Sequence, residues 1–252
     1  MNYISLTAGS PQTITADVVE EAQVCLSVNG QELATWMCSP HQLEWLALGF
    51  LANEGVIRSL ADVHHVHMAK SGRCLDVWLN DTAVTLPSRR IITAGCGGGV
   101  TFDDLSQKHE PLAADLTTSA TAAQIAELMR QVHLGAEKYQ MTRGIHTAAL
   151  ATAEKLLIQV EDIGRHNCID KLRGAAMQMC LPTRGLILLS SGRISSEMLN
   201  KARQMEIPLV CSRTSPTSLS VALAEAWHIA IVGYIRQDRM RLYTHPQRVV
   251  GY

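Results

Sequence analysis

Residues 156–179 read LLIQVEDIGRHNCIDKLRGAAMQM, and this stretch decides the fold. Residues 156–160 form a short apolar run, which predicts a buried strand. Six of the next seven residues, 161–167, are polar or glycine and predict a loop, and the apolar spacing over 168–179 predicts a helix. A strand followed by a polar junction and a helix is the repeating unit of α/β proteins.

The same unit recurs on both sides of this stretch. Upstream, residues 147–151 predict a strand that forms a hairpin with 156–160, and the capping box Thr121-Ala122-Ala123-Gln124 opens a helix. Downstream, strands at 186–189, 208–211 and 229–235 alternate with helices at 196–205 and 219–227, the second capped by Ser215-Pro216. This alternation predicts a mostly parallel sheet covered by helices on both faces.

The first third of the chain has the pattern of a small α+β unit. Four strands are expected, at residues 24–28, 33–37, 63–68 and 75–79. Asn29-Gly30 is a strong hairpin-turn signal between the first two strands. A helix follows the second strand, for which we expect Ser39 as N-cap, Pro40 at the first helical position and Gln42 closing a capping box.

Residues 110–120 are rich in Pro, Ala, Thr and Ser, and this composition predicts a linker. We therefore expect two domains. The first, residues 1–110, is a small α+β domain that ends in a glycine-rich loop around Cys96, and the second, residues 111–252, is an α/β domain.

Composition narrows the function classes. The formal net charge of −1 and the pI of about 6.8 argue against a general nucleic-acid-binding protein. No apolar run is long enough to span a membrane, and the N-terminus lacks the pattern of a signal peptide. Seven scattered cysteines without a Cys-x-x-Cys pair predict reduced thiols in the cytoplasm. His65 and His67 share a strand face, but no acid or cysteine is spaced to complete a site, so no protein-bound metal is expected.

Three polar clusters fall where this scheme places strand ends, which is where open α/β sheets bind ligands. They are EDIGRHN (161–167), SSGRISSE (190–197) and YIRQDR (234–239). The second offers backbone N–H groups and Arg193 to an anion. In the third, Arg236 and Arg239 can grip phosphates and Tyr234 can stack on a base. Each cluster also has a plain structural interpretation, as a polar loop, a helix cap or a solvated hairpin turn.

Cys96 lies in the run Gly95-Cys96-Gly97-Gly98-Gly99, after two arginines, Arg89 and Arg90. Glycines this dense do not build a core strand or helix, because they cost backbone entropy and bury nothing. A single thiol in such a loop beside arginines has the setting of a reactive cysteine, for which His146 is a candidate base. The competing interpretation is a buried cysteine near a turn.

The order of these segments resembles the formate dehydrogenase accessory sulfurtransferases, the FdhD family, over nearly the whole chain. The matching segments are LSVNG (26–30), LGFLANEG (48–55), GIH (144–146), EDIGRHNCIDK (161–171), SSGR (190–193), SPTSL (215–219) and YIRQDR (234–239). The acidic-Gly-Arg-His-Asn segment is the most specific of them.

The resemblance implies a fold and an activity. The fold is a cytidine-deaminase-like α/β/α sandwich joined to a smaller N-terminal α+β domain, although the zinc signature of deaminases is absent from this sequence. The activity is sulfur transfer. Cys96 accepts persulfide sulfur from a cysteine desulfurase and passes it to the bis-molybdopterin guanine dinucleotide cofactor, bound as a substrate. The other implied partners are the catalytic subunit of formate dehydrogenase and a second copy of the chain, in a homodimer.

The resemblance also implies site residues. Cys96 matches the persulfide-carrying cysteine, and the residues expected to bind the cofactor are Tyr234, Ile235, Arg236, Gln237, Asp238, Arg239, His146, Arg165, His166, Asn167, Ser191 and Arg193. The family commonly has Cys-Gly-x-Cys-Gly at the reactive loop, whereas Gly99 stands here in place of the second cysteine.

Two other functions stay open. Gly99 favours a chaperone that binds the molybdenum cofactor without transferring sulfur. A cysteine hydrolase that pairs Cys96 with His146 or His166 is the weaker alternative, because no hydrolase signature surrounds Cys96.

Overall fold

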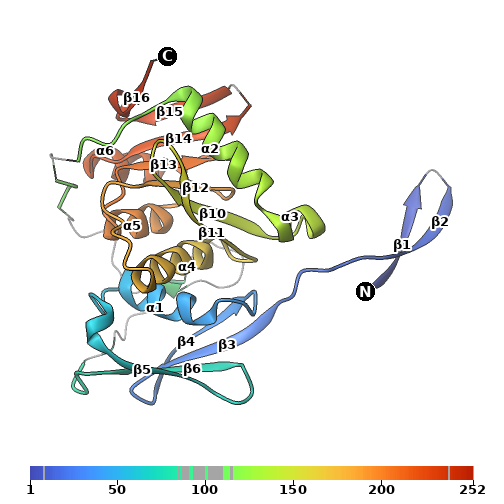
Figure 1. Cartoon of the computed structure of the whole chain (residues 1–252), viewed down its shortest axis with the longest axis vertical. Coiled ribbons are helices and arrows are strands. Elements are labelled where there is room, and N and C mark those ends of the chain that lie inside the picture. Colours follow the sequence, from blue (N-terminus) through green and yellow to red (C-terminus); the bar gives the residue numbers. More distant parts are fainter. Residues whose placement is uncertain are drawn as a thin grey trace.

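The structure, a computed structural model, describes residues 1–7, 9–84, 86, 91–92, 100–101, 110–113, 116–237 and 239–251 (Figure 1). Cys96, with its neighbouring glycines, lies outside the described residues, as do Arg89, Arg90 and Asp238. The predictions that concern these residues therefore stay predictions. The short strands β7 (Ile91–Ile92) and β8 (Val100–Thr101), which pair antiparallel, stand directly before and after residues 93–99.

The larger sheet has the strand order β11-β10-β12-β13-β14-β15. Its strands are β10 (His146–Ala151), β11 (Leu156–Asp162), β12 (Ile187–Ser190), β13 (Leu209–Ser212), β14 (Ala230–Arg236) and β15 (Arg239–Thr244). The pairs β12–β13 and β13–β14 are parallel, whereas β10–β11, β10–β12 and β14–β15 are antiparallel. The prediction of a mostly parallel sheet is therefore wrong, because a hairpin at each end of the sheet reverses the chain. The predicted hairpin of residues 147–151 and 156–160 is confirmed.

Helices cover both faces of this sheet, as predicted (Figure 1). Along each central strand, alternate side chains enter two different cores: Leu188 and Val210 belong to one, and Leu189 and Cys211 to the other. The first core is closed by α4 (Arg165–Gln178), α5 (Ser196–Gln204) and α6 (Ser218–Ala226), and the second by α2 (Ala122–Leu134). The α/β/α sandwich is therefore confirmed. The short helix α3 (Glu137–Thr142) follows α2.

A second, four-stranded sheet lies at the other end of the molecule, with the order β4-β3-β6-β5 (Figure 1). Its strands are β3 (Ala22–Val28), β4 (Gln31–Cys38), β5 (Val63–Met68) and β6 (Cys74–Leu79), and it packs with α1 (Leu43–Asn53) and the turn η1 (Leu60–Asp62). Asn29 and Gly30 have φ angles of 52° and 78°, which confirms the predicted tight turn between β3 and β4.

Two predicted helix caps are wrong. The N-cap of α1 is Gln42, in a left-handed conformation with φ 55° and without a side-chain hydrogen bond. The hydroxyl of Ser39 instead accepts the N–H of Ile163, 3.2 Å away, from a distant part of the chain. The N-cap of α6 is Thr217 rather than Ser215-Pro216. The predicted capping box at the start of α2 is confirmed, with both reciprocal hydrogen bonds present.

The small and large sheets meet where α1 crosses α4 at two glycines. A Cβ atom on Gly49 would lie 1.7 Å from the carbonyl oxygen of Asp170, and one on Gly174 would lie 2.0 Å from that of Trp45. The helices therefore touch backbone to backbone, which requires glycine at both positions. Across this crossing the Asn53 amide of α1 donates to the carboxylate of Asp170 at 2.8 Å, and the same carboxylate forms a buried ion pair with Lys201 of α5.

The described part of residues 110–120, for which the sequence predicts a linker, packs against the large domain. Leu112 and Leu116 are buried in the core under α4. Thr118 donates to the carbonyl of Gly185, 2.7 Å away, and Arg248 donates to the carbonyl of Thr118. The strand β9 (Ala120–Thr121) pairs with β16 (Val249–Val250), which follows the turn η2 (Pro246–Arg248).

The prediction that all cysteines are reduced is also wrong, because Cys25 and Cys74 form a disulfide. They lie opposite each other on the neighbouring parallel strands β3 and β6. A separation of 49 residues conceals this pairing in the sequence. Among the described residues, Cys38, Cys168 and Cys211 are buried free thiols and Cys180 is an exposed one.

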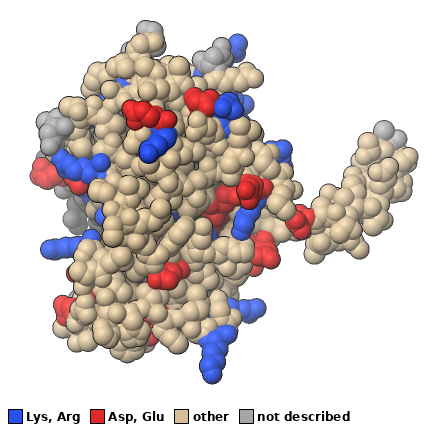
Figure 2. Space-filling model, viewed as in Figure 1, with Lys and Arg blue, Asp and Glu red and all other residues tan. Residues whose placement is uncertain are grey.

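The N-terminal hairpin of β1 (Asn2–Thr7) and β2 (Ser10–Thr15) projects from the body as an arm (Figures 1 and 2). The arm carries no charged side chain, whereas acidic and basic side chains are interspersed on the face of the body that Figure 2 shows. Within the described part of the chain, no helix has the length and apolarity needed to cross a membrane.

Candidate ligand-binding site

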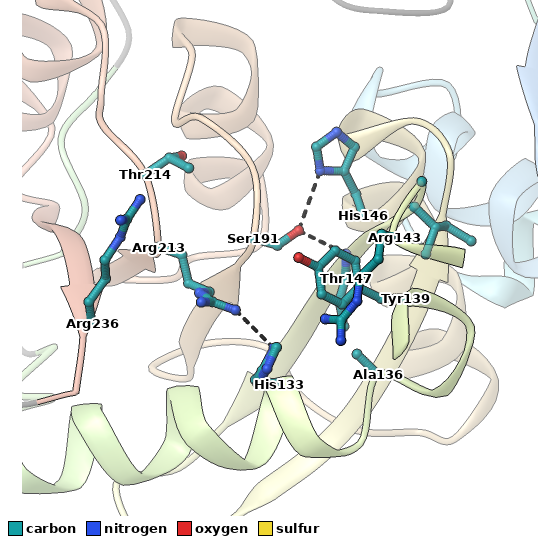
Figure 3. Close-up of a pocket in the computed structure, with 12 residues that line it drawn as sticks. His133, Ala136, Tyr139, Arg143, His146, Thr147, Ser191, Arg213, Thr214 and Arg236 are labelled. Carbon is teal, nitrogen blue, oxygen red and sulfur yellow. Dashed lines mark hydrogen bonds between the residues drawn. The ribbon is translucent and has the colours of Figure 1, made fainter. Parts of the chain in front are cut away.

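A pocket of about 460 Å³ opens at the edge of the large sheet where β12, β13 and β14 end (Figure 3). The sheet side of the pocket carries His146, Ser191, Arg213 and Arg236. The opposite side comes from the end of α2 and from α3. The full lining is His133, Ala136, Tyr139, Arg143, Gly144, Ile145, His146, Thr147, Ser191, Arg213, Thr214 and Arg236.

The strand order explains why residues so distant in sequence meet here. Ser191 and Arg213 directly follow the parallel strands β12 and β13, and Arg236 is the last residue of β14. His146 begins β10, which runs antiparallel to β12, so its first residue lies at the same edge. The carboxyl ends of parallel strands are the usual ligand-binding edge of an open α/β sheet.

His146 and Ser191 are held together by short contacts. The hydroxyl oxygen of Ser191 accepts the backbone N–H of Thr147 at 3.0 Å and lies 3.3 Å from Nδ1 of His146. The N–H of Ser191 donates in turn to the carbonyl of Thr147 at 2.9 Å. This fixes both side chains at the sheet edge, where Figure 3 shows them facing the pocket.

The surroundings of the His146 imidazole favour its neutral form. Burial lowers its pKa below the usual value, and the nearby charge of Arg165 lowers that pKa further. A neutral imidazole offers one donor and one acceptor, which suits a polar ligand group.

The opposite wall consists of residues that the sequence analysis did not select. Nη1 of Arg213 lies 2.9 Å from Nδ1 of His133 (Figure 3). The ring of His133 meets the ring of Tyr139 edge-on at 5.9 Å, and the guanidinium of Arg143 lies 5.1 Å from the centre of the Tyr139 ring. The two rings of His133 and Tyr139 therefore lie between the guanidinium groups of Arg213 and Arg143.

Glu161 sets the position of that wall. Its carboxylate accepts the N–H groups of Lys138 and Tyr139 at 3.0 and 2.8 Å, so it caps the start of α3 from β11. A carboxylate at a helix N-terminus is favoured by the helix dipole. The first acid of the EDIGRHN segment thus supports the pocket without lining it.

A second lobe of about 470 Å³ adjoins the first along α2. His133, Arg213 and Arg236 line both lobes. The second lobe is more apolar, because its remaining lining includes Ala123, Ala126, Met129 and Ile235, with Gln237, Glu127 and Arg130 beside them. The two lobes thus form one groove with two arginines at its centre.

Arg165, His166 and Asn167 form the first turn of α4, which begins three residues before the predicted start at Cys168. All three are buried, and none lines either lobe. Arg165 packs under the loop after β12, since a Cβ on Gly192 would lie 2.9 Å from the Cβ of Arg165 and 3.4 Å from Nδ1 of His146. A direct contact of these three residues with a ligand stays a prediction.

His166 and Asn167 contact protein groups instead. Nε2 of His166 lies 3.0 Å from a carboxylate oxygen of Glu197 and 3.2 Å from the hydroxyl of Ser195, the N-cap of α5. Burial lowers the pKa of His166, and the hydrogen bond to Glu197 opposes that shift. The Asn167 amide donates to the carbonyl of Met37 at 3.0 Å.

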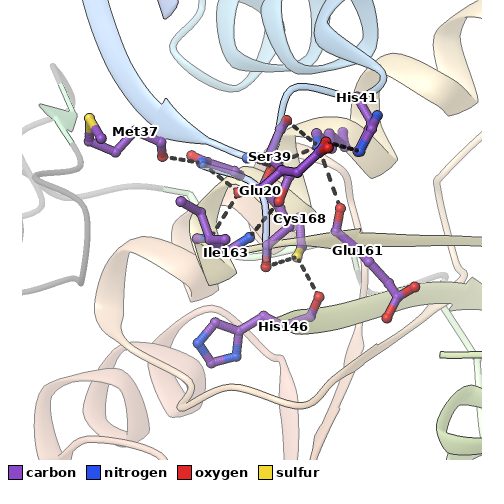
Figure 4. Close-up of polar contacts among 12 residues, drawn as sticks. Glu20, Met37, Ser39, His41, His146, Glu161, Ile163 and Cys168 are labelled. Carbon is purple, nitrogen blue, oxygen red and sulfur yellow. Dashed lines mark hydrogen bonds and ion pairs between the residues drawn. The ribbon is translucent and has the colours of Figure 1, made fainter. Parts of the chain in front are cut away.

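Asp162 ties the small sheet to the edge of the large one, in the region where Figure 4 shows Ser39 close to Ile163 and Cys168. Its carboxylate forms an ion pair of 2.6 Å with Lys171, and both side chains are completely buried. It also accepts the N–H of Ser39 at 3.2 Å, the N–H of Gly164 at 2.8 Å and the Asn167 amide at 2.8 Å. A buried charge is tolerated only with such compensation, so the role of Asp162 is structural.

The YIRQDR segment begins in β14 and reaches the first residue of β15, so it lies at the end of the last long strand, as predicted. Arg236 lines both lobes, and Ile235 and Gln237 line the second. Tyr234 lines neither, and its ring lies 4.1 Å from the guanidinium of Arg241. Arg239 is exposed, and so is Arg193 of the SSGR segment; neither lines the lobes.

Comparisons with known proteins agree with this architecture. The sequence profile of the FdhD/NarQ family matches residues 19–250. The sulfur carrier protein FdhD of Bacillus pumilus (strain SAFR-032) is 37% identical over 238 residues, covering 93% of this chain and 91% of that protein. The protein of the same name from Staphylococcus aureus (strain MRSA252) is 35% identical over 239 residues, covering 94% and 90%.

A solved structure shares the fold. The crystal structure of a candidate formate dehydrogenase accessory protein from Desulfotalea psychrophila matches with a TM-score of 0.81 at 24% identity, covering 99% of this chain and 98% of that one. The class of fold is thus an α/β/α sandwich with an attached small α+β unit. The profile match and the two curated relatives show, in addition, that the chain belongs to the FdhD/NarQ family.

Proposed function

We propose that this protein is a sulfurtransferase that carries persulfide sulfur on Cys96 and delivers it to the bis-molybdopterin guanine dinucleotide cofactor. Relatives named sulfur carrier proteins support the carrier role. The observation that carries the proposal is the convergence of His146, Ser191 and Arg236. These residues come from three separate segments of the family resemblance and line one groove together with Arg213.

The chemistry begins with the Cys96 thiolate. It attacks the outer sulfur of a persulfide on a cysteine desulfurase, so a new S–S bond forms on Cys96 and the donor's S–S bond breaks. The donor cysteine leaves as a thiolate, and no net oxidation occurs. In delivery, the Cys96 sulfur leaves as a thiolate, and the terminal sulfur becomes sulfide by taking two electrons from the reduced molybdenum of the substrate.

The groove fits the guanine dinucleotide arm of that substrate. Arg213 and Arg236 are donors suited to phosphate oxygens, because guanidinium groups form charge-assisted hydrogen bonds. The ring of Tyr139 and the apolar side of the second lobe suit planar heterocycles. The positively charged groups of the groove suit the anionic phosphates of this ligand, and its aromatic and apolar groups suit the planar heterocycles.

The partners and the compartment belong to the same proposal. The donor is a cysteine desulfurase, the recipient is the catalytic subunit of formate dehydrogenase, and the reaction takes place in the cytoplasm. The active form is a homodimer, and residues 1–110 form the domain that carries the Cys96 loop. Arg165, His166, Asn167, Arg193, Tyr234 and Asp238 remain proposed contributors to the cofactor site, together with Arg239.

Replacing Cys96 tests the proposal. In cells that lack their own copy, Cys96→Ala should accumulate as folded protein without supporting formate dehydrogenase activity. Cys180→Ser is the matched control, because Cys180 is an exposed free thiol far along the chain, and it should support full activity. Full activity of Cys96→Ala would contradict sulfur transfer and leave the alternative that Gly99 favours, a chaperone that binds the cofactor only.

A further inference from the structure

The junction of the two lobes is built around a histidine–arginine hydrogen bond. His133, near the end of α2, and Arg213, directly after β13, line both lobes together with Arg236. The distance from Nη1 of Arg213 to Nδ1 of His133 is 2.9 Å. Among the described residues, no carboxylate forms an ion pair with Arg213 or Arg236.

The direction of the hydrogen bond follows from the chemistry of the two groups. A guanidinium has five N–H donors and no acceptor, so the lone pair of His133 Nδ1 must accept. The ring proton of His133 is then on Nε2, and the imidazole is neutral. This bond uses one donor of Arg213, and it fixes a side chain that is otherwise rich in rotamers.

We propose, building on the proposed function, that Arg213 is a phosphate-binding residue of the cofactor site and that His133 is the residue that positions it. Arg213 and Arg236 together bind a diphosphate at the junction of the two lobes. Of the two planar heterocycles attached to that diphosphate, one lies in each lobe. The ligand class is thus a diphosphate ester that joins two heterocyclic groups, with the polar lobe lined by His146 and Ser191 taking one of them.

The groups around His133 make this contact sensitive to pH. Arg213 approaches it from the end of β13, and Arg143 and the Tyr139 ring approach from α3. From β14 and β10, Arg236 and His146 line the same pocket. On its own helix, Glu127 and Arg130 line the second lobe and are paired with each other.

Protonation of His133 turns Nδ1 into a donor, so it breaks the bond to Arg213 and adds a positive charge beside two arginines. Burial, and then the charges of Arg213 and Arg143, lower the pKa of His133. The bond therefore weakens as the pH falls, because a protonated Nδ1 cannot accept, and Arg213 then loses the contact that holds its guanidinium in position.

Calorimetric titration with GDP at pH 7.5 and 5.5 tests the assignment. At pH 7.5, Arg213→Ala should weaken binding about tenfold or more, because charge-assisted hydrogen bonds to phosphate are strong. Arg213→Lys should recover only part of the loss, since lysine keeps the charge without the fork. His133→Leu removes the acceptor and should weaken binding several-fold.

His133→Asn is the matched control, because the amide oxygen can accept from Arg213 but does not titrate. It should bind within about twofold of the wild type at pH 7.5 and lose less affinity at pH 5.5 than the wild type does. The phosphate groups of GDP titrate equally with both proteins, so the comparison cancels their effect. The melting temperature of each variant confirms that the protein remains folded.

The outcomes separate this inference from the proposed function. Wild-type affinity in Arg213→Ala or in His133→Leu would overturn the inference, and so would tighter binding by the wild type at pH 5.5 than at pH 7.5. If Arg236→Ala loses affinity for GDP while Arg213→Ala does not, the result supports the proposed cofactor site and contradicts a role of Arg213 in it. If the wild type binds no GDP, the proposed cofactor site itself is wrong.

Discussion

Replacing Gly49 by alanine should push α1 away from α4 at the point where the two helices touch backbone to backbone. The added Cβ would lie 1.7 Å from the carbonyl oxygen of Asp170, half of the 3.4 Å at which ordinary contacts of a Cβ begin. The obstacle is the backbone of α4, which cannot rotate away as a side chain can. The helices must therefore move apart, and this movement disturbs the buried hydrogen bond from the Asn53 amide of α1 to the Asp170 carboxylate of α4.

The magnitude follows from the size of this clash. Overpacking a close-packed core by one methyl group costs about 1–3 kcal/mol. Because the clash is with backbone, we expect a loss near the upper end, about 3 kcal/mol. For a chain of this size, each 1 kcal/mol corresponds to roughly 2–4 °C in melting temperature. Gly49→Ala should therefore lower the melting temperature by about 6–12 °C.

Thermal unfolding followed by circular dichroism measures this loss, with Gly135→Ala as the matched control. A Cβ on Gly135 lies 3.1 Å from the end of the Gln159 side chain, which can move. That variant should melt within about 4 °C of the wild type, since an alanine at a compatible site changes stability by about 1 kcal/mol or less. Equal melting temperatures of the two variants would refute the backbone contact of α1 and α4.

Three further predictions concern the site. Arg165→Ala and His166→Ala should each weaken GDP binding in calorimetry while lowering the melting temperature by only a few degrees; a large thermal loss with normal binding would make both purely structural. Arg236→Ala combined with Arg239→Ala should weaken GDP binding at least tenfold, because each charge-assisted contact contributes about 1.5–3 kcal/mol, and unchanged affinity would exclude a role in phosphate binding. Burial lowers the pKa of His146, so the unfolded state takes up its proton first as the pH falls below about 6.5, and the free energy of unfolding falls with it. The melting temperature should therefore fall from pH 7.5 to 5.5, and by a smaller amount in His146→Gln; an equal fall in that variant would contradict the assignment.

The local elements were predictable from the sequence, whereas their order and direction were not. Apolar runs and the Asn29-Gly30 turn identify strands and a hairpin, because these depend on residues that are neighbours in the chain. The antiparallel pairing of β10 with β12 depends on a sheet order that local periodicity does not encode. Ser39 shows the same limit: its hydroxyl binds Ile163, so an ideal capping sequence does not start α1.

Part of the site was predictable for the same reason. The rule that ligands bind at strand ends finds Ser191 and Arg236, whereas His146 was selected as a candidate base and through the family resemblance. Applied to the strand at 208–211, the same rule would also have found Arg213. His133 and Tyr139 lie on helices, where polar side chains are ordinary, so nothing in their spacing marks them. The acid of the EDIGRHN segment that has the most contacts, Asp162, proves to be a buried structural group.

Mass spectrometry of the sulfur-loaded protein tests the central claim most directly. The protein is incubated with a cysteine desulfurase and cysteine, its remaining thiols are alkylated, and the peptides are mapped. We predict a gain of about 32 Da, one sulfur atom, on the peptide that contains Cys96, with loss of that sulfur when the cofactor-bearing recipient is added. A gain confined to another cysteine, or no gain at all, would contradict the account.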